Sequence, residues 1–187
     1  MRFIRTKIRE VVICEPQIFG DGRGYFVETF RLDKFEDFLG FKLNFCQDNE
    51  SKSSFGVLRG LHYQLAPYVQ SKLVRVIEGR ILDVAVDIRI GSPTFGEHVS
   101  VELNGENKRQ LFIPKGFAHG FVSLSDDTIV AYKVDNYYNH ESDRGIIFND
   151  ETLGINWELE LDRLKISDKD IKQCSFSKAE YLNLLDE

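Results

Sequence analysis

The stretch SKLVRVIEGRILDVAVDIRIGS, from Ser71 to Ser92, decides the fold class. Apolar and polar residues alternate on both sides of Glu78-Gly79, with the period of two that sends side chains to opposite faces of a β-strand. A glycine at position 79 supplies the backbone freedom that a sharp change of direction needs. The stretch therefore predicts two strands joined by a hairpin or a tight corner.

Further strand-like runs lie on both sides of this pair. Upstream are EVVICEP and YFVETF, separated by the turn-forming GDGRG, and downstream are HVSVELN, RQLFIP, GFVSLSD and TIVAYKVDNYY. Turn residues separate the downstream runs at intervals typical of a sandwich or barrel rather than of βαβ units. A chain of 187 residues is long enough to bury a sizeable core. We therefore expect an all-β fold, one domain over residues 1–187.

Two helices are expected beside the strands. RLDKFEDFLG, at positions 31–40, carries its leucines and phenylalanines at helical spacing and ends in glycine, a frequent residue just after a helix. The tail from Ser177 to Glu187 carries alanine, tyrosine and leucines that predict a second helix packed on the sheets.

Composition narrows the possible partners and the compartment. The net charge of −6 argues against a broad nucleic-acid surface, although a few local cations suffice for one nucleotide-sized anion. The charged N-terminus is unlike a signal peptide, and no apolar run is long enough to span a bilayer. Three widely spaced cysteines, Cys14, Cys46 and Cys174, suggest neither a disulfide framework nor a zinc site. We expect a cytoplasmic protein with no nucleic-acid or membrane partner.

Two of the four histidines lie in strand-like, aromatic-rich surroundings: His62 in GLHYQL and His119 in GFAHGF. Each could be a hydrogen-bonded core residue, or a proton carrier or ligand, because histidine titrates near neutrality. The chain has no pair of histidines two residues apart with a nearby carboxylate, as metal sites in jelly-roll oxygenases have. No metal is therefore expected.

Cations and tyrosines also lie in apolar runs. Arg59 and Lys72 either face solvent or face inward, and an inward cation needs a carboxylate or an anionic ligand as its partner. Tyr132 is either a packed residue or a general acid, and Tyr137 or Tyr138 could stack on a nucleobase.

Arg59 and His62 pose a problem of geometry in GVLRGLHYQL. Residues three apart lie on opposite faces of a regular strand, so the two side chains could not share a pocket. We therefore predict a local irregularity, a bulge or a strong twist, between them.

Six blocks of the sequence together indicate a family. GRGYFVETF, QDNESKSSFGVLRGLHYQ, KLVRVIEGRILDVAVDIRIGSPTFG, LFIPKGFAHGFVSLSD, AYKVDNYY and GINW occur in this order. From about Val11 to Asp170 the chain resembles the dTDP-4-dehydrorhamnose 3,5-epimerase family. The resemblance implies a metal-free, cofactor-free jelly roll of the cupin type that forms a homodimer and binds a dTDP-sugar.

The resemblance also implies a role for individual residues. His62 would be the general base, Asp170 its partner, and Tyr132 the acid on the opposite face of the sugar. Lys72 would lie near the C4 carbonyl oxygen. The other implied substrate contacts are Arg23 and Arg59 near the phosphates, Tyr138 stacked on the thymine, and Glu28, Gln47, Asp48, Asn49, His119, Asp143 and Lys169.

Two positions depart from the family pattern. Asp143 stands where a glutamate is common, which affects one nucleotide contact. Phe148, in FND, stands where WND is common, and we expect this change to affect packing alone.

The implied reaction inverts C3 and C5 of dTDP-4-dehydro-6-deoxy-D-glucose to give dTDP-4-dehydro-L-rhamnose. Both carbons are acidic because they adjoin a ketone, so an enolate can form at either. Four alternatives stay open: an epimerase that inverts one centre or takes a GDP-sugar or a heptose, a ketoisomerase of the same fold, a non-catalytic sugar-nucleotide-binding jelly roll, and a metal-dependent cupin.

Overall fold

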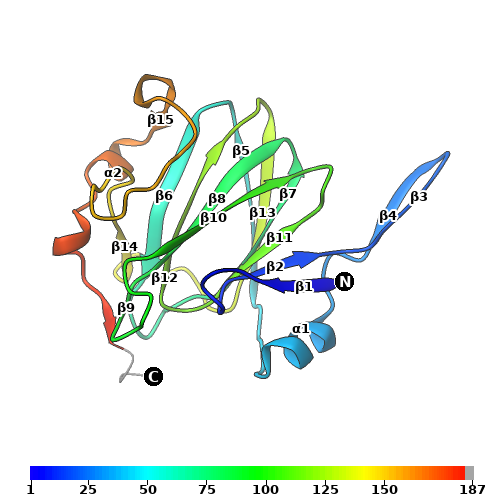
Figure 1. Ribbon diagram of the computed structural model, residues 1–187, viewed down its shortest axis with the longest axis horizontal. Helices are drawn as coiled ribbons and strands as arrows, with labels where there is room; N and C mark the ends of the chain where they lie inside the picture. The colour runs from blue at the N-terminus through cyan, green and yellow to red at the C-terminus, as the bar shows by residue number, and fades with distance from the viewer. Residues whose placement is uncertain (184–187) are drawn as a thin grey trace.

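Two β-sheets packed face to face form the centre of the computed structural model, which describes residues 1–183 (Figure 1). The first sheet has the order β1 (Arg2–Arg5), β2 (Val12–Glu15), β11 (Gln110–Ile113), β7 (Lys72–Glu78), β13 (Thr128–Val134) and β5 (Gln47–Ser53). The second has the order β10 (His98–Asn104), β8 (Arg80–Asp87), β12 (Phe117–Ser123), β6 (Val57–Gln64) and β14 (Asp143–Gly145), and β15 (Lys165–Ile166) pairs in parallel with β6. The expected all-β jelly-roll sandwich is confirmed.

The chain changes sheets at Gly79. β7 ends at Glu78 in the first sheet and β8 begins at Arg80 in the second, so the predicted connection is a corner and not a hairpin. Gly79 has φ 81°, and a Cβ atom there would lie 2.6 Å from the Thr128 hydroxyl oxygen. Only glycine fits this corner without a rearrangement.

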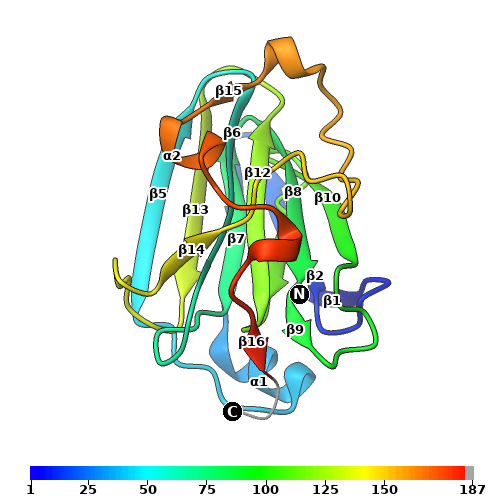
Figure 2. The same ribbon diagram turned by 90° about the vertical axis from the view of Figure 1, so that its left-hand side faces the viewer.

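β8 is buried on both of its faces. Ile81 and Ala85 face the apolar cluster between the sheets, while Leu82, Val84 and Val86 face a second cluster on the outer side. The C-terminal segment covers that outer side (Figure 2), and its Trp157 and Phe176 belong to the second cluster. A second layer on this sheet explains why nearly every residue of β8 is buried.

Helix α1 (Leu32–Leu39) confirms the prediction for positions 31–40. It ends at Gly40, whose φ is 82°, and its Phe35 is fully buried against Val12 and Phe112 on the outer face of the first sheet. The other helical segments are short: α2 (Asp168–Ile171) and the 3₁₀ turns η1 (Leu161–Arg163) and η2 (Phe176–Lys178). Among the described residues, no helix has the length and apolar character needed to cross a membrane.

The predicted C-terminal helix is wrong for the described part of the tail. After the 3₁₀ turn the chain is extended, and β16 (Leu182–Asn183) pairs in parallel with β9 (Arg89–Ile90). The ring of Tyr181 packs edge-on against Phe95 and Phe176 at centroid distances of 5.0 and 5.3 Å. These aromatic contacts with the body of the protein outweigh the local helical pattern. Residues 184–187 lie outside the described residues.

The hairpin of β3 (Ile18–Asp21) and β4 (Gly24–Val27) projects away from the sandwich (Figure 1). Its turn contains the GDGRG motif, as predicted from the sequence. The hairpin exposes four large apolar side chains, with exposed fractions between 42% and 68%: Ile18, Phe19, Tyr25 and Phe26.

Candidate active site

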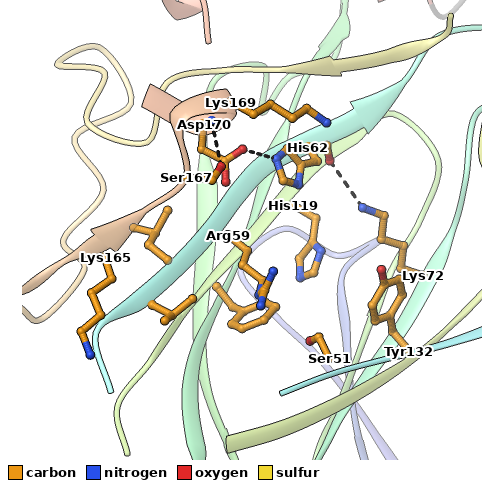
Figure 3. Close-up of a pocket in the computed structure, with 13 residues that line it drawn as sticks. Ser51, Arg59, His62, Lys72, His119, Tyr132, Lys165, Ser167, Lys169 and Asp170 are labelled. Atoms are coloured by element: carbon orange, nitrogen blue, oxygen red, sulfur yellow. Dashed lines mark hydrogen bonds and ion pairs between the residues drawn. The ribbon is translucent and has the colours of Figure 1, made fainter. Parts of the chain in front are cut away.

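A cavity of about 550 Å³ opens between the two sheets (Figure 3). Side chains from the second sheet, the first sheet and the segment around α2 all reach it. The residues that line it are Ser51, Val57, Leu58, Arg59, His62, Lys72, His119, Phe121, Tyr132, Lys165, Ser167, Lys169 and Asp170.

A second cavity of about 350 Å³ adjoins the first and shares four lining residues with it: His62, Lys72, Tyr132 and Lys169. Its remaining residues are mostly polar: Gln47, Asn49, Tyr63, Gln64, Gln70, Tyr138 and Asp143. Together the cavities form an elongated, cation-bearing site whose volume suits a ligand larger than one sugar ring.

The predicted irregularity between Arg59 and His62 is confirmed. His119 on β12 pairs with His62 on β6, and Phe121 pairs with Arg59. An advance of two residues along β12 is therefore matched by three residues along β6, which leaves one extra residue in β6. At Gly60 the backbone has φ 129°, and a Cβ atom would lie 2.5 Å from the Cα of Gly120. The extra residue turns both side chains toward one cavity.

His62 and Asp170 form a tight pair. His62 Nε2 lies 2.6 Å from Asp170 Oδ1, and the Asp170 side chain is 4% exposed. Burial acts to raise the pKa of Asp170, but the hydrogen bonds from His62, from the Gly60 amide and with Ser167 outweigh it and lower that pKa. An ionised carboxylate only accepts hydrogen bonds, so Nε2 carries the proton and Nδ1 keeps its lone pair.

The local sequence ISDKD explains where Asp170 sits. Ser167 caps the single turn of α2, and its hydroxyl accepts a hydrogen bond of 3.1 Å from the Asp170 amide. The cap fixes the backbone at Asp170, which directs the carboxylate at His62.

Tyr132 lies across the cavity from His62. His62 belongs to β6 of the second sheet and Tyr132 to β13 of the first, so the imidazole and the phenol approach from opposite walls (Figure 3). Burial raises the pKa of Tyr132, which Arg59 partly counters. The phenol therefore stays protonated at neutral pH and can donate a proton.

Lys72 contributes a cation beside the pair of His62 and Asp170. Its Nζ donates a hydrogen bond of 3.4 Å to the His62 carbonyl oxygen. Burial lowers the pKa of Lys72 to about 8, against the opposing effect of the carboxylates of Asp83 and Asp143. The ammonium group therefore lies within the site, and with a pKa of about 8 it loses its charge only slightly above neutral pH.

His119 reaches the cavity from β12 and pairs with a buried residue of the neighbouring strand β8. Its Nε2 lies 2.7 Å from Oδ1 of Asp83, a residue with no exposed surface. Among the described residues, two buried side-chain polar atoms have no hydrogen-bond partner, Ser51 Oγ and Asp83 Oδ2, and both belong to this region. Within residues 1–183, no three His, Cys, Asp or Glu side chains gather closely enough to hold a metal ion.

At the far end of the second cavity, Asp143 connects two other predicted site residues. Its Oδ2 accepts hydrogen bonds from the Tyr138 hydroxyl, at 3.2 Å, and from Lys169 Nζ. The Tyr138 residue is 55% exposed. Phe148 lies away from this site in the outer apolar cluster, where its carbonyl accepts a hydrogen bond from the Trp157 indole.

The structure does not bring three of the predicted contact residues, Arg23, Glu28 and Asp48, into either of these two cavities. Arg23 lies in the β3–β4 hairpin with a side chain 90% exposed and paired with Asp21, and Glu28 faces Lys34 beyond the end of β4. Asp48 follows the period of two along β5: Gln47 and Asn49 face the second cavity, whereas Asp48 pairs with Lys133 on the outer face of the sheet.

Several residues of the site were missed in the sequence. Extending the alternation of Gln47 and Asn49 by two positions along QDNESKS would have found Ser51. Phe121 could have been found in the same way from His119. No local pattern marks Lys165 or Ser167, because a long loop carries them to β6.

Comparisons with known proteins agree with this geometry. Residues 5–178 match the family model described as dTDP-4-dehydrorhamnose 3,5-epimerase. A protein of that name from Shigella flexneri is 53% identical over 97% of this chain and 99% of its own length. The chain belongs to this family.

Solved structures extend the family comparison. A dTDP-6-deoxy-D-glucose-3,5-epimerase from Legionella pneumophila, in complex with dTDP-4-keto-L-rhamnose, has a TM-score of 0.92 and 49% identity, over 96% of this chain and 94% of the other. A 3′-monoepimerase from Streptomyces bikiniensis, in complex with dTDP-quinovose, has a TM-score of 0.88 and 32% identity, over 97% of this chain and 93% of the other. The family fold thus serves both double and single inversion.

Proposed function

We propose that this chain is a dTDP-4-dehydrorhamnose 3,5-epimerase of dTDP-L-rhamnose biosynthesis. The observation that carries the proposal is the position of His62 and Tyr132 on opposite walls of one cavity. Inversion of a carbon requires that a proton leave from one face of the sugar ring and return from the other. A base and an acid facing each other across a cavity have the geometry for that exchange.

The first step removes a proton from a carbon beside the C4 ketone. His62 Nδ1 accepts the proton, and the imidazolium that forms is stabilised by the Asp170 carboxylate at 2.6 Å from Nε2. The C–H electron pair moves into the enolate, whose negative charge develops on the C4 oxygen. The Lys72 ammonium stabilises this charge, and one well-placed donor of this kind contributes about 3–4 kcal/mol.

The second step returns a proton from the other wall. Tyr132 donates its phenolic proton to the enolate carbon, and the C4 carbonyl re-forms with inverted configuration at that carbon. C3 and C5 flank the same ketone, so the same four side chains serve both centres once the ring shifts in the cavity and exchange with water returns a proton to Tyr132 and removes the one on His62. No redox partner is needed because the substrate and product are isomers.

The nucleotide end of the site is formed by the second cavity. We assign the dTDP part of the substrate to the surface of Tyr138, Asp143 and Lys169, with Gln47 and Asn49 nearby. The exposed ring of Tyr138 offers a stacking surface for thymine. Arg59 and His119 contact the substrate at the sugar–diphosphate end.

We further propose that two copies of the chain form the active enzyme. The β3–β4 hairpin stands away from its own sandwich and exposes Ile18, Phe19, Tyr25 and Phe26, a surface that a second copy can cover. Arg23, carried by this hairpin, and Glu28 would then reach the cavity of the partner. The three free cysteines, Cys14, Cys46 and Cys174, fit the reducing cytoplasm.

The test is incubation with dTDP-4-dehydro-6-deoxy-D-glucose in D2O, followed by NMR. We expect deuterium at both C3 and C5 and formation of dTDP-4-dehydro-L-rhamnose. Deuterium at C3 alone would instead indicate an epimerase that inverts one carbon, like the 3′-monoepimerase from Streptomyces bikiniensis. Faster turnover of a GDP-sugar than of the dTDP-sugar would show that the substrate carries a different nucleotide. Absence of deuterium at both carbons would reject the epimerase proposal.

A further inference from the structure

Asp83 is a buried carboxylate with one unused oxygen. It lies in the middle of β8, has no exposed surface, and receives a hydrogen bond on Oδ1 from His119 Nε2 at 2.7 Å. Its Oδ2 is buried and has no hydrogen-bond partner among the described residues. A buried carboxylate left partly unsatisfied is costly to a fold, so its charge must be compensated by other groups.

The compensating groups lie at the cavity. Burial lowers the pKa of Lys72 on β7 and of His119 on β12, and in each case the charge of Asp83 opposes this shift. No nitrogen of Lys72 lies within 4.0 Å of the Asp83 carboxylate, so the two are coupled through space rather than by an ion pair. Lys72 shares the two cavities with other titratable or charged groups from every element around it: Arg59, His62 and Tyr63 on β6, Tyr132 on β13, Tyr138, Asp143 on β14, Lys165 on β15, and Lys169 and Asp170 on α2.

We propose that Asp83 is a positioning residue that keeps Lys72 in its ammonium form and fixes the orientation of His119. This inference rests on the proposed epimerase function. Asp83 does not line the cavity. It acts through two side chains that do.

The charge of Lys72 is the sensitive quantity. Its pKa is lowered to about 8 by burial even with two carboxylates opposing the shift. Of those two, Asp143 is already paired with Lys169, whereas Asp83 has a free oxygen. Removing the charge of Asp83 therefore brings the pKa of Lys72 nearer to neutral pH, and a neutral amine cannot stabilise an enolate by its charge.

The orientation of His119 depends on the same carboxylate. Because an ionised carboxylate only accepts hydrogen bonds, His119 Nε2 carries the proton and Nδ1 is left for the cavity. An asparagine at position 83 could pair with His119 Nε2 in either tautomer: its amide oxygen would accept from a protonated Nε2, and its NH2 group would donate to an unprotonated Nε2. The single tautomer would then no longer be imposed.

The test compares Asp83→Asn with the wild type by the pH dependence of kcat/KM. We expect the alkaline fall of activity, centred near pH 8 in the wild type, to move about one pH unit lower in the variant. At pH 8 this shift corresponds to about a fivefold loss, which approaches tenfold at higher pH and shrinks toward pH 6.5. A fall in thermal stability with an unchanged pH profile would overturn the proposal and leave Asp83 a structural residue.

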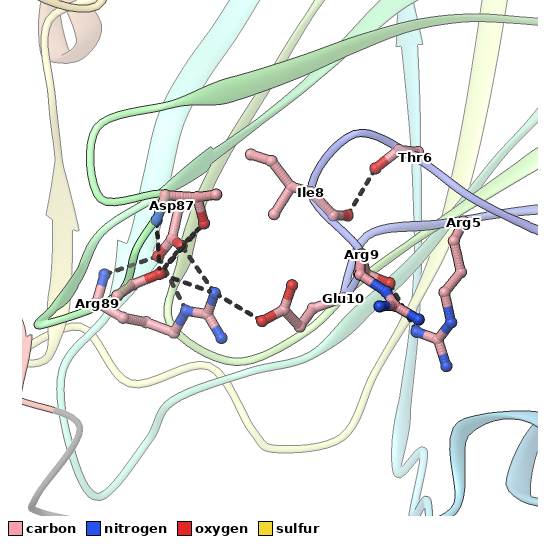
Figure 4. Close-up of polar contacts among 9 residues, drawn as sticks. Arg5, Thr6, Ile8, Arg9, Glu10, Asp87 and Arg89 are labelled. Carbon is pink, nitrogen blue, oxygen red and sulfur yellow. Dashed lines mark hydrogen bonds and ion pairs between the residues drawn. The ribbon is translucent and has the colours of Figure 1, made fainter.

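Asp87→Asn is the matched control. Asp87 is a second fully buried carboxylate of β8, but at the far end of the strand it binds Ser92, Thr94 and Arg89. Figure 4 shows its contact with Arg89. Its replacement should lower stability and leave the alkaline limb where it is. An equal shift of the limb in both variants would contradict a specific role for Asp83.

Lys72→Arg keeps the test decisive if Asp83→Asn does not fold. Arginine does not lose its proton in this pH range, so the alkaline limb should disappear or move above pH 10. A limb that stays near pH 8 in Lys72→Arg would show that another group titrates there, and the proposal would fail. All of these pH profiles require a wild-type protein that exchanges protons at C3 or C5. A wild type without that exchange would reject the epimerase proposal itself, which distinguishes that failure from a failure of the Asp83 proposal.

Discussion

At the scale of single residues, the two walls of the cavity can be tested separately. Replacing Tyr132 by phenylalanine removes the hydroxyl proposed to act as the acid and leaves His62, Asp170 and Lys72 in place. We expect enolate formation to continue and protonation from the far wall to stop, so deuterium should enter the substrate while inversion falls by at least about 100-fold. NMR of the recovered sugar nucleotide measures both quantities in one sample.

The comparison of exchange with inversion also contains its own control. A simple loss of folding or binding would reduce deuterium incorporation and inversion together, by the same factor. Parallel losses in Tyr132→Phe would therefore argue against a separate acid on the first sheet. Retained inversion would show that another group, or water, supplies the second proton.

At the scale of elements, the irregular strand β6 determines the site. Gly60→Ala places a Cβ atom 2.5 Å from the Cα of Gly120 and 2.8 Å from the His119 carbonyl oxygen, in a backbone with φ 129°. We expect a loss of about 3 kcal/mol or more in unfolding free energy, because both contacts are with backbone that cannot move aside. Urea unfolding followed by circular dichroism measures the loss.

Gly22→Ala is the control for this substitution. A Cβ atom at Gly22 meets no atom within 4 Å, so its unfolding free energy should stay within about 0.5 kcal/mol of the wild type. Comparable losses in the two variants would mean that the close packing of β6 against β12 at Gly60 does not stabilise the fold.

A second element to test is the loop that follows β8. Asp87 receives hydrogen bonds from Arg89 at 2.7 Å, from Ser92 at 2.5 Å and from Thr94 at 2.6 Å, and Arg89 also reaches Glu10 (Figure 4). Burial acts to raise the pKa of Asp87, but these bonds outweigh it and lower that pKa. We expect Asp87→Asn to lose about 2–4 kcal/mol of unfolding free energy at pH 7.

The pH dependence gives the sign of this contribution. Because the pKa of Asp87 is lower in the folded than in the unfolded state, its stabilisation is complete above about pH 5 and disappears as the pH falls through the folded value. The difference between wild type and Asp87→Asn should therefore shrink below about pH 4. A difference that stays constant from pH 7 to pH 3 would contradict the assignment to ionised Asp87.

The elements also show what the sequence could and could not predict. The period of two in 71–92 predicted β7 and β8 because alternation follows directly from strand geometry. The helical pattern of the tail failed, because the packing of Tyr181 against Phe95 and Phe176 decides the conformation there. The irregularity at Gly60 was predictable because Arg59 and His62 could not otherwise share a pocket.

At the scale of the whole molecule, the sequence could not predict which residues of distant strands and of the β3–β4 hairpin belong to the site. The residue types of an acid–base site could be recognised, and the family resemblance assigned roles to them. Asp83 was missed because it is a buried residue among the apolar residues of β8 and does not line the cavity, and only its unpaired oxygen marks it. Arg23 and Glu28 could not be placed, because one chain alone does not bring them to its own cavity.

The proposed dimer leads to a test with mixed subunits. Arg23→Ala and His62→Asn would each inactivate or strongly weaken a homodimer, the first through the hairpin and the second through the cavity. If the hairpin of one copy serves the cavity of the other, a mixed dimer contains one site with both Arg23 and His62 intact. After subunit exchange at equal concentrations, activity should return to about a quarter of the wild-type value.

The result separates the two possible arrangements of the hairpin. If Arg23 acted in the cavity of its own chain, every site in the mixture would carry one defect, and no activity would return. Light scattering of the double variant Phe19→Ser, Phe26→Ser provides the matching structural measurement, because both rings are more than half exposed in the single chain. We expect this variant to be largely monomeric and inactive; a stable, active dimer would show that the hairpin is not part of the interface.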